Sequence, residues 1–207
     1  MRRKKDRLVV ITGAGSGIGA ALAGEAARAG ARLILAGRRK EALEETAAQL
    51  PASCAPILVQ ADITKAEGRT AIAEAVAGAG SKFDILINNA GAVRTGSIAG
   101  MTEAAVMEML QTNLAAPLLL SRDLLPFLKR AAAPRIVNVG SMFGDIAFPL
   151  FAAYSATKFG LRGLSDALRR ELAPDGVGVT YAAPRAVRTP AAQSFEGLVE
   201  PCAMKLD

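Results

Sequence analysis

The chain has 207 residues, with 25 Lys and Arg against 19 Asp and Glu, and a formal net charge of +6. It has no histidine and two cysteines, which excludes Ser-His-Asp and Cys-His catalysis, histidine-ligated metal sites and a disulfide framework. We therefore expect no metal, and a cytoplasmic, reducing location suits the cysteine content. Apolar residues make up 51%, enough for a buried core, and we expect a single domain over residues 1–207.

Most of the excess positive charge lies at the amino end. Residues 2–7 (RRKKDR) carry a net +4, which leaves +2 for the rest of the chain. Such a diffuse charge, with two tyrosines and no tryptophan, argues against a nucleic-acid surface. The basic start and the apolar run after it imitate a secretory leader, but four glycines interrupt that run, and its pattern predicts strand, turn and helix. No uninterrupted apolar run reaches about 18 residues, so we expect no membrane span.

Short apolar runs alternate with longer helical patterns along the chain. The predicted strands cover residues 7–12, 32–37, 55–61, 84–88, 135–140 and 177–183. The predicted helices cover residues 16–29, 40–50, 64–79, 102–130 (with breaks) and 151–172. Pro117 and Pro126 should bend or end a helical segment, and Gly30 and Gly80 stand where helix carboxyl ends favour glycine. This alternation predicts an α/β fold, a doubly wound, mostly parallel, Rossmann-like sheet of about six strands with helices on both faces.

The first predicted strand runs into a glycine-rich turn, TGAGSGIG at residues 12–19, and then directly into a helix. Glycines permit a tight turn and let the backbone approach a pyrophosphate, whose charge is attracted by the free N–H groups at the helix start. The alternative is a turn that only packs strand against helix, but its place in the first strand–helix connection favours dinucleotide binding. The predicted binding residues are Gly13, Gly15, Ser16, Gly17, Ile18 and Gly19.

The end of the second predicted strand indicates which dinucleotide binds. Sites for NAD usually place an acidic residue there to hold the ribose hydroxyls. This chain has Gly37-Arg38-Arg39-Lys40 and no carboxylate before Glu41. Arg38 could hold a 2′-phosphate by charge-assisted hydrogen bonds, which favours NADP(H) over NAD(H). Alternatively, the three cations form a solvated helix start, although the helix dipole disfavours cations there.

Further motifs follow in a fixed order. They are Asp62-Ile63, Asn88-Asn89-Ala90-Gly91, Asn113, Ser141 and YSATK from Tyr154 to Lys158. No single motif is specific, but the ordered set, over about residues 8–189, closely resembles the short-chain dehydrogenase/reductase family. The resemblance implies an NADP(H)-dependent oxidoreductase that interconverts a ketone or aldehyde and an alcohol by hydride transfer.

The residue types of the last motifs suit such chemistry. Tyr154 and Lys158 stand four residues apart on a predicted helix and therefore share a face. An adjacent ammonium favours the ionised form of a phenol whose pKa is ordinarily about 10, which suits Tyr154 to general acid and base work. Ser141, at a strand end, could donate a hydrogen bond to the same substrate oxygen. Taken singly, such a Ser is commonly a turn residue and an Asn such as Asn113 commonly a helix cap, and only their combination points to catalysis.

The resemblance assigns the remaining roles. Asn113 would position a water that links Lys158 to a proton relay, and Lys158 would also bond the nicotinamide ribose. The implied catalytic residues are Asn113, Ser141, Tyr154 and Lys158. The implied cofactor contacts, besides the glycine turn and Arg38, are Asp62 and Ile63 at the adenine, Asn88, Ala90 and Gly91 along the cleft, Tyr154 and Lys158, and Pro184, Val187 and Thr189 near the nicotinamide. The resemblance further implies a small-molecule substrate and a homodimer or homotetramer formed through helices around residues 114–130 and 151–172.

Two features depart from the family pattern. Where the family commonly has Pro-Gly after the sixth strand, this chain has Pro184-Arg185, and the Arg185 side chain either points to solvent or intrudes on the cleft. The chain also stops at Asp207, before the helix and seventh strand that family members usually add, so we expect a C-terminally short member whose sixth strand is a sheet edge. A dinucleotide-binding redox sensor and a defective truncated enzyme therefore remain alternatives on the same fold. A phenylalanine-rich stretch after Ser141 either walls an apolar pocket or belongs to the core.

Overall fold

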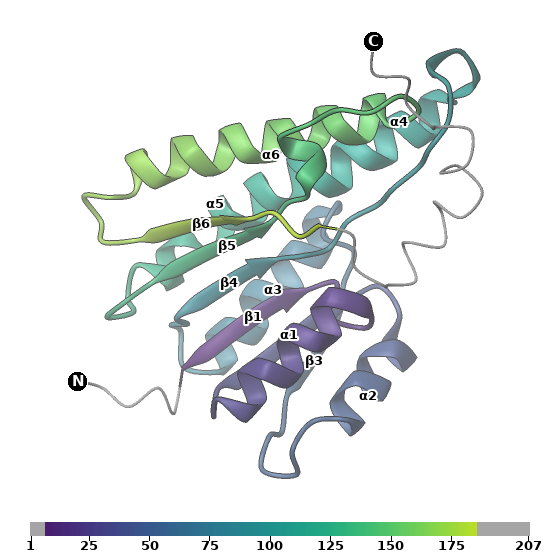
Figure 1. Ribbon diagram of the computed structural model, residues 1–207. Helices are drawn as coiled ribbons and strands as arrows, with labels where there is room; N and C mark the ends of the chain where they lie inside the picture. The colour runs from purple at the N-terminus through teal and green to yellow at the C-terminus, as the bar shows by residue number, and fades with distance from the viewer. Residues whose placement is uncertain (1–6, 186–207) are drawn as a thin grey trace.

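The computed structural model describes residues 7–185, and its centre is one sheet of six parallel strands (Figure 1). The strands are β1 (Leu8–Thr12), β2 (Arg32–Gly37), β3 (Ile57–Gln60), β4 (Ile85–Asn88), β5 (Arg135–Val139) and β6 (Gly178–Ala182). Their order across the sheet is β3-β2-β1-β4-β5-β6. The order reverses between β1 and β4, and the loops that leave these two strands diverge there. A crevice at such a switch point is where doubly wound sheets bind ligands.

Helices cover both faces of the sheet, as expected from the sequence. They are α1 (Gly17–Arg28), α2 (Lys40–Ala48), α3 (Ala66–Gly78), α4 (Glu103–Leu110), α5 (Ala116–Leu128) and α6 (Ala152–Glu171). One core layer packs α1 and α2 against the sheet, and the other packs α3, α5 and the end of α6 against its opposite face. Within residues 7–185, no helix has the length and apolar character needed to cross a membrane.

The predicted elements are all present, with ends within two residues of the expected positions, apart from the long helix. The helix predicted over residues 102–130 is three segments: α4, a π-helical turn η2 (Gln111–Ala115) and α5. Pro117 lies in the first turn of α5, where a missing N–H costs little. Pro126 lies inside α5, close to its last residue, Leu128. Gly30 and Gly80 follow their helices with positive φ angles of 82° and 120°, the conformation that favours glycine at helix ends.

Candidate active site

A cleft of about 1310 Å³ runs along the carboxyl ends of the strands, from the glycine turn to the loop after β6. It brings together most of the residues expected from the sequence. Those that line it are Gly13, Gly15, Ser16, Gly17, Ile18, Arg38, Asp62, Ile63, Ala90, Gly91, Ser141, Tyr154, Lys158 and Pro184. Gly19, Asn88 and Asn113 are not among its lining residues. Val187 and Thr189 lie outside the described residues.

The glycine turn is shaped by close approach to its neighbours. Gly13 has a φ of +64°, and a Cβ there would lie 2.8 Å from the Cα of Ala90. Gly19 lies behind the turn, where a Cβ would overlap the carbonyl oxygen of Gly13, so it serves the packing of α1 against the loop. Ser16, at the start of α1, makes no side-chain capping hydrogen bond, and the first turn of α1 has no acidic residue. This combination of backbone N–H groups and an uncompensated dipole suits a pyrophosphate.

Two side chains that sequence reasoning did not single out hold this turn in place. The Thr12 hydroxyl accepts hydrogen bonds from the N–H groups of Asn89 (3.0 Å) and Ala90 (3.1 Å). The Asn89 side-chain amide donates to the carbonyl oxygens of Thr12 (3.0 Å) and Gly13 (3.2 Å). These contacts tie the loop after β1 to the loop after β4, across the switch point. The sequence signal for these contacts was the pair Thr12-Gly13 at the end of β1 together with the pair Asn88-Asn89 at the end of β4.

Asn88 does not line the cleft, contrary to the expectation from the family resemblance. Its side chain is 3% exposed, and its amide donates to Ser121 Oγ (3.2 Å) and Asn138 Oδ1 (2.8 Å). Asn138 in turn donates to Ser165 Oγ at 2.9 Å. Because side chains alternate along a strand, Asn88 faces α5 and its successor Asn89 reaches the cleft. Asn88 therefore belongs to a buried polar chain that joins β4 and β5 to α5 and α6.

The ends of β2 and β3 form the basic end of the cleft. Arg38 and Arg39 both line it and are exposed, and neither makes a salt bridge within the described part of the chain. Arg39 directly precedes α2 and makes no side-chain capping hydrogen bond, while Glu41 in the first turn of α2 offsets part of the helix dipole. Burial alone would raise the pKa of Asp62, but hydrogen bonds from Thr64 and the charges of Arg38 and Lys65 outweigh it and leave that pKa below its ordinary value. The exposed cations at this end of the cleft suit a negatively charged group of a bound dinucleotide.

The opposite end of the cleft holds Ser141, Tyr154 and Lys158. Ser141 directly precedes the short 3-10 helix η3 (Met142–Gly144), and its hydroxyl lies near enough to the Tyr154 phenol to act on the pKa of that group. Tyr154 and Lys158 occupy the first two turns of α6, with Lys158 Nζ 5.6 Å from the centre of the Tyr154 ring. The Lys158 ammonium donates to the carbonyl oxygen of Val139 at 3.1 Å. Three chemically active groups thus converge from the end of β5 and the start of α6.

The electrostatics of this end differ from the expectation for Tyr154. Burial raises the pKa of Tyr154 and the nearby Tyr181 adds to the rise, while the hydrogen bond with Ser141 opposes it. Burial also lowers the pKa of Lys158 to about 8. The expected lowering of the Tyr154 pKa by an adjacent ammonium is therefore not seen, because enclosure disfavours the charged form of both groups. At neutral pH both groups hold their protons.

Asn113 lies in the π-helical turn η2 and is 1% exposed. Its Oδ1 accepts from the Ala92 N–H (2.7 Å), and its Nδ2 donates to the Ala92 carbonyl (2.8 Å) and to Thr157 Oγ1 (3.1 Å). Thr157, a further residue that sequence reasoning missed, donates to the Tyr154 carbonyl at 2.7 Å. Asn113 therefore braces the loop after β4 against the start of α6, and π-helical turns are frequent at functional sites. Its expected part in holding a water stays a prediction.

Aromatic side chains wall the cleft beside Tyr154. Phe143 stacks on Phe151 with ring centres 4.5 Å apart, and it meets Phe148 and Tyr154 edge-on at 5.4 and 5.8 Å. Phe143, Phe148 and Phe151 all line the cleft and are only partly buried, so the phenylalanine-rich stretch forms a pocket wall. Arg185 also lines the cleft, at its rim, and is exposed.

Comparisons with known proteins identify relatives of this chain. A sequence model of the short chain dehydrogenase family matches residues 7–197. Dehydrogenase/reductase SDR family member 7B from Bos taurus is 35% identical over 192 residues, which cover 89% of this chain and 59% of the bovine protein. The chain thus spans less than two thirds of that relative's length.

Two solved structures carry the same fold. A putative NAD(P)-dependent gluconate 5-dehydrogenase from Beutenbergia cavernae, with bound NADP at low occupancy, has a TM-score of 0.83 and 36% identity, covering 94% of this chain and 78% of that one. The 3-ketoacyl-(acyl-carrier-protein) reductase from Brucella melitensis, complexed with NADH, has a TM-score of 0.86 and 28% identity, covering 92% and 80%.

Proposed function

Because the chain belongs to the short-chain dehydrogenase/reductase family, we propose that it is an NADP(H)-dependent oxidoreductase that interconverts a ketone or aldehyde and an alcohol. One observation carries the proposal: the Ser141 hydroxyl, the Tyr154 phenol and the buried Lys158 ammonium meet at the end of the cleft opposite the basic residues. A dinucleotide extended along the cleft would have its phosphates at the glycine turn and its reactive ring near these three groups.

The proton chemistry belongs to the protein. NADP(H), when bound, supplies or accepts the hydride. In the reductive direction the substrate carbonyl oxygen accepts hydrogen bonds from Ser141 and Tyr154, and Tyr154 gives its phenolic proton to that oxygen as the alcohol forms. The raised pKa of Tyr154 keeps this proton in place at neutral pH. We propose that the Lys158 ammonium, 5.6 Å from the ring centre, stabilises the phenolate left behind, an effect that in the resting protein is smaller than the opposing effect of burial.

Tyr154→Phe tests this assignment, because it removes the hydroxyl and keeps the ring packed against Phe143. We expect turnover with NADPH and a panel of carbonyl compounds to fall by about 10²–10⁴-fold. The dissociation constant of NADPH, measured by its fluorescence, should stay unchanged, since the residues that fit its phosphates lie at the other end of the cleft. Near-normal turnover of the variant would show that another group supplies the proton.

We propose NADP(H) rather than NAD(H) as the cofactor. The support is the pair of exposed cations Arg38 and Arg39 beside the start of α2, neither of which makes a salt bridge within residues 7–185. Arg38→Gln should weaken NADPH binding by about 10- to 100-fold, since a hydrogen bond to a charged group contributes about 1.5–3 kcal/mol. It should leave NADH binding unchanged. Lys40→Gln is the matched control, because Lys40 pairs with Glu44 and lies outside the cleft lining. Equal losses for both cofactors would remove the assignment.

The aromatic wall supports a substrate with an apolar group on its carbonyl carbon. Phe143, Phe148 and Phe151 face the space beside Tyr154, and burial of an apolar substituent there contributes about 25 cal/mol per Å². We expect kcat/KM to be higher for acetophenone than for a polyhydroxylated ketone of similar size, and Phe143→Ala to reduce that preference. A reversed preference would contradict this reading of the wall.

The alternative from another class is a redox sensor that binds the dinucleotide without turnover. The convergence of Ser141 with Tyr154 and Lys158 favours an enzyme, because a sensor has no need of a proton donor beside the cofactor. Tight NADPH binding without oxidation by any compound of the panel would favour the sensor.

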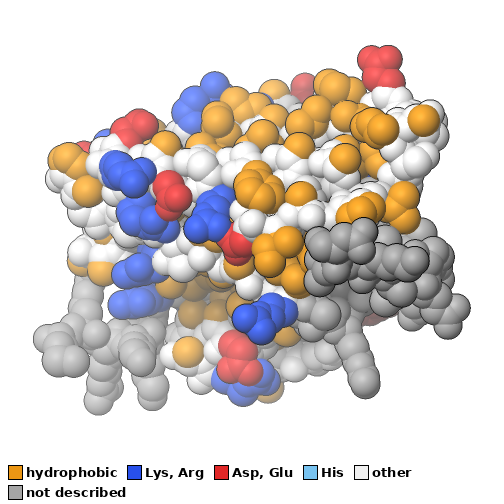
Figure 2. All heavy atoms as spheres, turned by 45° about the horizontal axis from the view of Figure 1, so that its top comes forward, with side chains coloured by type: hydrophobic (Ala, Val, Ile, Leu, Met, Phe, Trp, Pro, Cys, Tyr) orange, Lys and Arg blue, Asp and Glu red, His pale blue; other side chains and the backbone are white. Residues whose placement is uncertain are grey.

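We further propose that the chain is a single domain located in a reducing compartment. Copies of the chain assemble through α5 and α6. Large apolar side chains are exposed on both helices, Leu118 at 44% and Phe159 at 44%. Hydrophobic side chains gather at the end of the molecule where α4 and the start of α6 lie (Figure 2). Light scattering of the protein should report a dimer or tetramer, and a stable monomer would contradict the proposal.

A further inference from the structure

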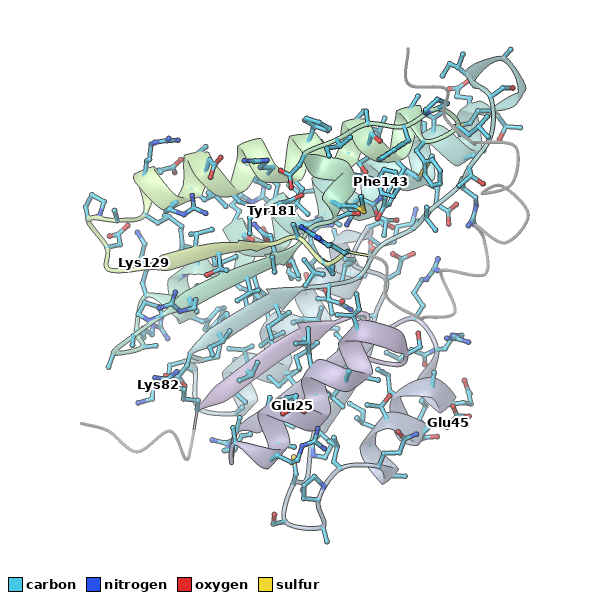
Figure 3. All side chains as sticks on the ribbon, in the orientation of Figure 1. Glu25, Glu45, Lys82, Lys129, Phe143 and Tyr181 are labelled. Atoms are coloured by element: carbon cyan, nitrogen blue, oxygen red, sulfur yellow. The ribbon has the colours of Figure 1, made fainter. Side chains whose placement is uncertain are left out.

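Tyr181 on β6 reaches the backbone of the serine expected to bind substrate. It lies on the side of the sheet that α6 covers (Figure 3). Its hydroxyl donates to the Ser141 carbonyl oxygen at 3.1 Å and accepts from the Ser141 N–H at 3.3 Å. The carbonyl oxygen of Lys158 is 3.5 Å from the same hydroxyl. One side chain thus touches the main chain at Ser141 and at Lys158.

Two glycines leave room for the Tyr181 ring. A Cβ at Gly140 would overlap ring atoms of Tyr181, and a Cβ at Gly144 would overlap its hydroxyl. Neither glycine has a positive φ, so their backbone conformations do not demand glycine. The absence of side chains at these two positions is explained by the passage of the Tyr181 ring beneath β5 and η3.

The hydroxyl supplies a contact that the sheet cannot. The N–H groups of Gly140 and Met142 bond to the carbonyls of Ala182 (2.7 Å) and Pro184 (3.2 Å) on the neighbouring chain segment. The N–H of Ser141, between them, points away from that ladder and takes the Tyr181 hydroxyl instead. Because the hydroxyl both donates to and accepts from one residue, it fixes the rotation of the Ser141 backbone and not only its distance.

We propose that Tyr181 is a positioning residue that sets the orientation of Ser141 toward Tyr154 through hydrogen bonds to the Ser141 main chain. The proposal rests on the proposed function only for the role of Ser141. A phenylalanine would fill the same space, so the hydroxyl itself carries the effect. Misplacement of a substrate-binding group by about 1 Å can cost about 10²-fold in rate.

Hydrogen exchange followed by NMR tests the hydrogen bonds between Tyr181 and the Ser141 main chain without any substrate. In Tyr181→Phe the Ser141 amide should exchange about fivefold faster, since a hydrogen bond contributes about 1 kcal/mol. The Gly140 and Met142 amides serve as internal references, because they bond to main-chain carbonyls that the substitution does not touch. Gly140 bonds to Ala182, within β6, and Met142 bonds to Pro184, after β6. Thr180→Val is the matched control, because it removes a hydroxyl one position away on the opposite face of the strand. Unchanged exchange at Ser141 would overturn the proposal.

A double-mutant cycle then tests the route of action, with acetophenone and NADPH as probes. Tyr181→Phe alone should lower kcat by about 10- to 100-fold and leave the NADPH dissociation constant unchanged. In a Ser141→Ala background the same change should have little further effect, because residues that act as a unit are not additive. Full additivity would overturn the proposal. If the proposed function is wrong, the wild-type protein will show no turnover. The exchange experiment will still show whether Tyr181 holds the Ser141 main chain.

Discussion

Replacing Lys158 by Met should raise the free energy of unfolding near pH 7, because the ammonium is held in an enclosed site. Lys158 is 5% exposed, its Nζ donates to the Val139 carbonyl, and burial is the only cause that shifts its pKa. Methionine has a similar length and no charge, so it keeps the packing and removes the cost of desolvation.

The magnitude follows from the pKa. Burial lowers the pKa of Lys158 from 10.5 to about 8, which at about 1.36 kcal/mol per pKa unit costs the folded state about 3 kcal/mol at pH 7. Loss of the hydrogen bond to Val139 offsets about 1 kcal/mol of the gain, so Lys158→Met should be more stable by about 2 kcal/mol. From pH 8 to 10.5 the unfolded wild-type chain retains the proton that the folded chain has released. Wild-type stability therefore rises with pH across that window, and the advantage of the variant disappears.

Urea unfolding followed by circular dichroism, near pH 7 and again near pH 10, measures both effects. Lys82→Met is the control, because Lys82 is exposed and its replacement should change stability little at either pH. The variant should also lose turnover and bind NADPH more weakly, so that the gain in stability and the loss of function come from one substitution. A Lys158→Met protein that is less stable near pH 7, or a difference that does not change with pH, would refute the reasoning.

Asn88→Ala should lower the free energy of unfolding by about 1–3 kcal/mol, because it leaves Asn138 and Ser121 short of a buried partner, and should leave NADPH affinity unchanged. Urea unfolding and cofactor titration would separate these effects. A loss of NADPH affinity without a loss of stability would show that Asn88 contributes to the cofactor site after all. Arg185→Gly should change the NADPH dissociation constant by less than about twofold, because an exposed side chain at the rim makes little net contact. A clear tightening in the same titration would show that Arg185 intrudes.

The order and spacing of the apolar runs and of the glycine turn were sufficient to predict the fold. Strands covered on both faces read as continuous apolar runs, and the glycine turn between β1 and α1 has one common use in a parallel sheet. The ordered motifs pointed to Ser141, Tyr154 and Lys158 through their resemblance to the family, and the spacing of Tyr154 and Lys158 placed those two on one face of a helix. The fold needed only local pattern, whereas these site residues needed the whole motif set.

Only the tertiary structure decided the contacts between distant segments. Asn88 and Asn89 are adjacent in sequence, yet strand alternation sends one into the core and the other to the glycine turn. The pKa of Tyr154 rises where an adjacent Lys158 suggested a fall, because burial depends on what the whole chain encloses. Tyr181 shows the same limit: a strand tyrosine carries no local sign of a partner 40 residues earlier. Its hydroxyl meets Ser141 because parallel pairing places β6 beside β5 and two glycines leave room for the ring.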